Sequence, residues 1–67
     1  MPLLKTFELY LHRRRQPPQF EALTCADELT LMAAMRERTT DPDVVAVEAF
    51  RLGEHIATVS RKARSGS

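Results

Sequence analysis

The residues that could support nucleophilic chemistry are one cysteine, Cys25, and two histidines, His12 and His55. A thiolate activated by an imidazole is a common catalytic pair, and the predicted helix that follows Cys25 would favour its thiolate form. In the predicted topology only His55 lies near Cys25. A lone cysteine beside an apolar run is usually a small buried side chain. We therefore predict a non-catalytic protein in which Cys25 is structural.

A metal site or a bound cofactor is not indicated either. Two scattered histidines and one cysteine do not supply the ligand spacing of a structural or catalytic metal centre. The single cysteine also excludes an intramolecular disulfide. We predict no cofactor and no metal ligands.

Arginine is the more informative residue type. Eight of the ten basic residues are arginines, and three of them form the run Arg13–Arg15 before Pro17 and Pro18. Arginine makes bidentate contacts with phosphates and carboxylates. The net charge of +1 gives no general attraction to nucleic acid. Three interpretations stay open: a solvated turn, a site for an acidic protein surface, and a site for nucleic acid.

The elements that position these residues follow from hydrophobic spacing. Residues 4–12 alternate, with Phe7, Leu9 and Leu11 on one side, which is typical of a half-buried strand. The two prolines end it. Residues 19–25 form a second strand, and Thr24 or Asp27 then offers a helix cap.

The second half of the chain predicts a helix and a hairpin. Residues 26–38 are rich in helix formers, with acidic residues first and arginines last, an order that complements the helix dipole. Pro42 ends the helix. Residues 44–50 and 55–61 read as strands joined by a turn at Gly53. The predicted fold is α+β, ββαββ, with a single helix packed on one face of a four-stranded antiparallel sheet.

Three stretches, "FELYLHR", "CADELTLMAAMRE" and "AVEAFRLGEHIATVSR", give the chain a resemblance to small bacterial ββαββ proteins of unknown role. The resemblance covers most of the chain. It implies the same fold, and it implies no activity and no functional residues.

A chain of 67 residues has room for one small domain. We assign residues 1–60 to it and expect residues 61–67 to be a polar, frayed tail. No apolar run is long enough to span a bilayer. A free cysteine without an export signal indicates a cytoplasmic protein.

The predicted topology gathers basic residues at one end of the sheet, which we call the basic end. The turn after the first strand, the end of the helix and the end of the last strand all lie there. The basic residues that they bring together, as candidates for binding an anion or an acidic partner, are Arg13, Arg14, Arg15, Arg36, Arg38, Arg61, Lys62 and Arg64.

The helix leaves one face of the sheet uncovered, and we call this the open face. Alternation places Tyr10, Phe50, Ile56 and Thr58 there as candidate partner-binding residues, and the opposite phase, with Phe50 and Ile56 in the core, stays open. The helix is also apolar on nearly all sides, which favours an assembly. We predict a protein–protein interaction module, as a homodimer or an accessory subunit. The alternative is a nucleic-acid- or ribosome-associated accessory protein that uses the basic end.

Overall fold

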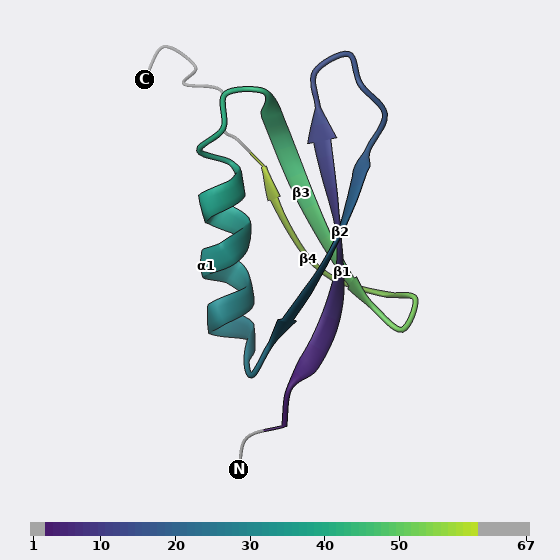
Figure 1. Cartoon of the computed structure of the whole chain (residues 1–67), viewed down its shortest axis with the longest axis vertical. Helices are drawn as coiled ribbons and strands as arrows, with labels where there is room; N and C mark the ends of the chain where they lie inside the picture. The colour runs from purple at the N-terminus through teal and green to yellow at the C-terminus, as the bar shows by residue number, and fades with distance from the viewer. Residues whose placement is uncertain (1–2, 61–67) are drawn as a thin grey trace.

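The computed structural model describes residues 3–60, which form four strands and one helix. In chain order these are β1 (Lys5–Arg13), β2 (Gln19–Cys25), α1 (Glu28–Arg38), β3 (Val44–Arg51) and β4 (Glu54–Ser60). The strands make one antiparallel sheet in the order β2-β1-β3-β4, and α1 packs on one face of it (Figure 1). The predicted ββαββ fold is confirmed.

Local signals set both ends of α1. The side chain of Asp27 caps the helix by accepting a hydrogen bond of 2.8 Å from the backbone N–H of Thr30. This bond stabilises the carboxylate and lowers the pKa of Asp27. Arg36 and Arg38 occupy the last turn, where their charge complements the helix dipole. Of the two predicted caps, Asp27 is the one used.

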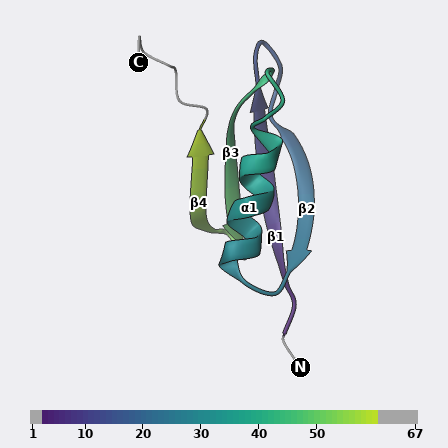
Figure 2. The same ribbon diagram turned by 90° about the vertical axis from the view of Figure 1, so that its left-hand side faces the viewer.

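The core lies between α1 and the sheet. Figure 2 shows α1 lying along the sheet in front of its central strands. Leu31 and Met35 are the fully buried side chains of the helix. They meet a set of buried residues from every strand except β4, namely Phe7, Leu9, Leu11, Cys25, Val44, Val47 and Ala49.

Two register shifts change which residues face the helix. Simple alternation would send Val44 and Val47 to opposite faces, because they are three residues apart. The pairing of β1 with β3 shifts between His12 and Arg13, and both valines are fully buried. The pairing of β3 with β4 shifts between Ala49 and Phe50.

The second shift corrects the predicted position of Ile56. Ala49 pairs with Ala57 and Phe50 pairs with His55, so Ile56 is the extra residue of a β-bulge. Ile56 packs against the buried core. Its expected place on the open face is therefore wrong.

The turns lie at opposite ends of the sheet. The β1–β2 turn, the end of α1 and the start of β3 share one end, and the β3–β4 turn lies at the other, on the side away from α1 (Figure 1). Two non-glycine residues in these turns have left-handed backbone conformations: Arg15, with φ of 57°, and Leu52, with φ of 53°.

No helix within residues 3–60 has the length and apolar character needed to cross a bilayer.

Candidate functional site on the open face

The open face carries a row of rings, one from each strand. The rings of Phe20 and Tyr10 have centroids 5.7 Å apart, those of Tyr10 and Phe50 are also 5.7 Å apart, and those of Phe50 and His55 are 5.3 Å apart. The planes are tilted or nearly perpendicular, which are the favoured geometries of aromatic pairs. The row therefore crosses the whole sheet without a break.

Strand pairing places these rings side by side. Tyr10 of β1 pairs directly with Phe20 of β2, and Phe50 of β3 pairs directly with His55 of β4. Tyr10 and Phe50 are diagonal neighbours on the two central strands, close enough for large side chains to touch. The row thus depends on β1 lying next to β3, although His12 of one and Glu48 of the other are 36 positions apart in the sequence.

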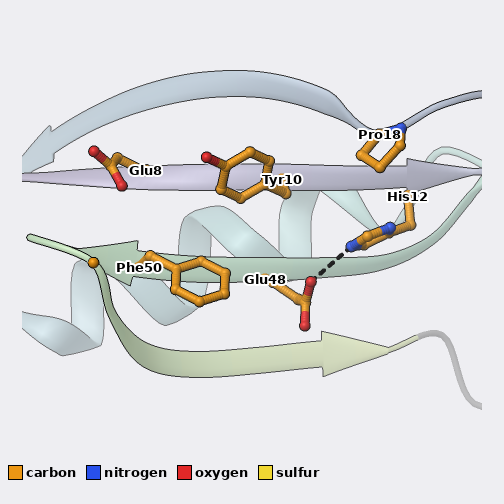
Figure 3. A pocket seen from close by; sticks show the side chains of 7 residues that line it. Glu8, Tyr10, His12, Pro18, Glu48 and Phe50 are labelled. Carbon is orange, nitrogen blue, oxygen red and sulfur yellow. Dashed lines mark hydrogen bonds and ion pairs between the residues drawn. The ribbon is translucent and has the colours of Figure 1, made fainter.

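A shallow groove of about 400 Å³ follows the open face. Its lining residues are Glu8, Tyr10, His12, Pro18, Glu48, Phe50 and Gly53. Figure 3 views this face with α1 behind the sheet, and the rings of Tyr10 and Phe50 lie between the side chains of Glu8 and Glu48. The groove is thus aromatic at its centre and acidic on both sides.

The groove has an acidic charge pattern. His12 Nε2 and Glu48 Oε1 lie 2.8 Å apart, so Glu48 has a partner on the same face. Glu8 is half-buried, and within residues 3–60 its carboxylate makes no ion pair or hydrogen bond. The groove lining contains no lysine or arginine. Negative charge is therefore left uncompensated beside two aromatic rings.

Sequence reasoning identified part of this site. Tyr10, Phe50 and Thr58 lie on the open face, and Thr58 pairs with Glu48. It missed Phe20, which is 56% exposed although it is a large aromatic residue. The signal was available in the alternation of β2, where Cys25 is buried and Phe20 lies in the opposite phase.

The described part of the basic end uses two of its arginines internally. The end of β1 with the turn that follows it, which carries Arg13, Arg14 and Arg15, lies at the same end of the sheet as the last turn of α1 (Figure 1), which carries Arg36 and Arg38. Arg13 donates to Asp41 Oδ2 at 3.0 Å and to Gln19 Oε1 at 3.1 Å. The remaining candidates, Arg61, Lys62 and Arg64, lie outside the described residues, as does the predicted tail.

The second internal pair joins α1 to β2. Arg38 Nε donates to Glu21 Oε1 at 2.9 Å, and Arg38 Nη2 donates to Glu21 Oε2. This bidentate contact holds the pKa of Glu21 below its ordinary value and raises the pKa of Arg38. The charge of Arg38 is thus directed at its own chain.

Three arginines of this end remain exposed. Arg14, Arg15 and Arg36 form no ion pair within residues 3–60. Arg14 and Arg15 line a hollow of about 720 Å³ together with Asp43 and Val45. An anion at this hollow would meet the carboxylate of Asp43 as well as the two guanidinium groups.

The structure separates the residues that suggested nucleophilic chemistry. Cys25 is buried on the α1 side of β2, and its Sγ lies 3.5 Å from the backbone oxygen of Asp27. His55 lies on the opposite face of β4, at the other edge of the sheet, beside Phe50 and Thr58. The prediction that His55 neighbours Cys25 is wrong. Within residues 3–60 no group of three potential metal ligands occurs.

The comparisons with known proteins were made against family models, curated proteins and solved structures. None of the three found a match to this chain.

Proposed function

We propose that this protein is a non-catalytic protein-binding module whose docking surface is the open face. The supporting observation is the unbroken row of Phe20, Tyr10, Phe50 and His55 on a face that α1 leaves uncovered. Exposed aromatic patches of this kind commonly mark interaction sites. Aromatic residues also supply much of the binding energy of protein interfaces.

The occupant that we propose is a different protein and not a second copy of the chain. A two-fold interface through the open face would place the same patch on both sides. The unpaired carboxylate of Glu8 would then be buried against a second copy of the same groove, whose lining contains two glutamates and no lysine or arginine. Like charges brought together away from water are strongly unfavourable, so self-pairing through this face is disfavoured.

The same carboxylates argue against stacked bases on the open face. RNA-binding sheets also stack bases on exposed aromatic residues, but phosphates would be repelled by a groove with two glutamates and no lysine or arginine. The exposed Arg14, Arg15 and Arg36 support a second candidate function, a nucleic-acid contact at the basic end.

Site-specific photo-crosslinking in the native host tests the proposed surface. A photoreactive phenylalanine analogue replaces Phe20 on the open face, and the same analogue at Leu29 is the matched control. Leu29 is 82% exposed on α1, so it is accessible but lies on the covered side of the sheet. We expect a discrete adduct from position 20 and none from position 29.

Introducing Phe50→Asp into the position-20 protein should remove the adduct, because a third carboxylate would disrupt the ring row. Sedimentation of the purified protein then distinguishes the occupants. An adduct of twice the chain mass, together with a dimer in solution, would identify a second copy as the occupant. Equal adducts from both positions would rule out the open face as the docking surface.

A further inference from the structure

We infer that the centre of the open face receives an arginine side chain from an extended basic segment of the partner. This inference rests on the proposed function, because it names the chemistry of the partner that the open face would bind. It follows from the way aromatic and acidic residues alternate on the two central strands.

The alternation is set by strand register. Tyr10 pairs across the sheet with Glu48, and Glu8 pairs with Phe50. Two aromatic rings and two carboxylates therefore occupy the corners of a four-residue square, with like groups on the diagonals. The rings meet nearly perpendicular, at 81°, so one ring presents its face beside the edge of the other.

This square matches the binding preferences of a guanidinium group. A cation is attracted to the face of an aromatic ring, more strongly where water is partly excluded. The planar guanidinium also forms paired hydrogen bonds with a carboxylate while it stacks on a ring. Glu8 is suited to this contact, since its carboxylate has no partner within residues 3–60.

The dimensions of the groove favour a peptide over a small ion. The lining residues of β1 run from Glu8 to His12. At the rise of a β-strand this distance is about 13 Å, enough for roughly four residues of extended chain. Pro18 borders the groove beside His12, and Gly53 borders it at the β3–β4 turn.

The intrinsic fluorescence of the protein can report on binding at this site. Tyr10 is its only tyrosine, and it has no tryptophan. Tyrosine emission therefore reports on the groove alone when the probe contains no aromatic residue. The probe is the acetylated and amidated peptide Ala-Arg-Ala-Arg-Ala, and the matched probe replaces arginine with citrulline, which has a similar shape and no charge.

We expect the arginine peptide to change Tyr10 emission saturably and to bind at least about tenfold more tightly than the citrulline peptide. Its affinity should fall as salt is raised, because the contact is between opposite charges. Equal affinity of the two peptides would overturn the inference, since shape alone would then explain binding.

Two charge variants sharpen the test. Glu8→Gln removes the unpaired carboxylate and should weaken the arginine peptide about fivefold or more, with no change for the citrulline peptide. Glu37→Gln changes the net charge equally, but Glu37 is exposed on α1, on the covered side of the sheet. It should leave both affinities unchanged. If Glu8→Gln and Glu37→Gln weakened binding of the arginine peptide equally, net charge alone would explain the binding. That result would overturn the inference.

A chain that ends at Ser60 tests the competing occupant within the protein itself. Residues 61–67 include Arg61, Lys62 and Arg64, whose side chains are positively charged like the arginines of the probe. We expect the full chain and the shortened chain to bind the peptide equally. Binding only by the shortened chain would assign the groove to the tail and overturn the inference.

Failure of the inference is separable from failure of the proposed function. If neither peptide changes Tyr10 emission while the position-20 adduct still depends on Phe50, the open face binds a protein by other chemistry and only the inference falls. If the adducts from positions 20 and 29 are also equal, both the inference and the proposed function are wrong.

Discussion

At the basic end, Arg13 and Arg38 each pair with a carboxylate of the same chain, whereas on the open face Glu8 has no partner within residues 3–60. The Arg38–Glu21 contact ties α1 to β2, and the Arg13–Asp41 contact ties β1 to the turn before β3. Two of the five described arginines at the basic end therefore help to hold the fold together. On the open face Glu48 pairs with His12, whereas the carboxylate of Glu8 is left available to a partner.

The two strained turns extend this comparison. Arg15 and Leu52 both adopt left-handed conformations, which cost most L-residues about 1–2 kcal/mol. Leu52 comes before Gly53 in a two-residue hairpin, a position that favours Asn or Asp. The side chain of Leu52 is 85% exposed, and the next residue, Gly53, lines the groove. Strain of this kind at an exposed apolar residue is a reason to look for a contact.

The largest expected effect separates binding from folding on the open face. Phe50→Asp should weaken association with the partner about 30-fold or more, as truncation of a central aromatic contact does. Phe20→Ser is the milder companion, because Phe20 is largely exposed and contributes little to the core. Association is measured by titration and stability by urea unfolding. Loss of folding and association in parallel for both variants would contradict the proposal.

The next effect compares the two turns directly. Leu52→Asn should raise the free energy of unfolding by about 1 kcal/mol, because asparagine tolerates the left-handed conformation. It should also weaken association several-fold, since an exposed leucine beside the groove is lost. Arg15→Asn should raise stability similarly and leave association unchanged. If Leu52→Asn and Arg15→Asn changed the association affinity equally, the proposed difference between the two turns would be wrong.

A smaller effect concerns the Arg38–Glu21 pair. Its contribution to stability is present above the unfolded pKa of Glu21 and is lost as the pH falls through the lower folded pKa. Glu21→Gln should reduce the free energy of unfolding by less than about 1 kcal/mol near neutral pH, because the pair is partly exposed. It should also flatten the decline in stability in acid. Urea unfolding between about pH 7 and 3 measures both, and an unchanged acid profile would contradict this role.

The smallest expected effect concerns nucleic acid. Arg14→Ser combined with Arg15→Ser removes two exposed guanidinium groups and spares Arg13, which pairs with Asp41. If the basic end contacts phosphates, the log–log salt slope of nucleic-acid binding should change by about 1.4–1.8. We expect no measurable change, in either single-stranded or duplex nucleic acid. A shift of that size would favour the second candidate function instead.

Prediction from the sequence worked where local signals decided the outcome. Alternation placed Phe7, Leu9 and Leu11 in the core and Tyr10 on the open face. It failed for Ile56 because a bulge adds one residue to β4 without leaving a mark in the hydrophobic pattern. Alternation also did not predict the contact between His12 and Glu48, because hydrophobic spacing does not determine the order of the strands in the sheet.

The sequence by itself determined the order of the elements, the short segment that caps the helix and the residues that alternate along each strand, because these depend on contacts between near neighbours. Only the tertiary structure decided that β1 lies beside β3, which brings Tyr10 to Phe50 and flanks them with Glu8 and Glu48. It likewise separated Cys25 from His55 by placing β2 and β4 at opposite edges. Strand order and bulges depend on packing across the whole sheet, which no short stretch of sequence contains.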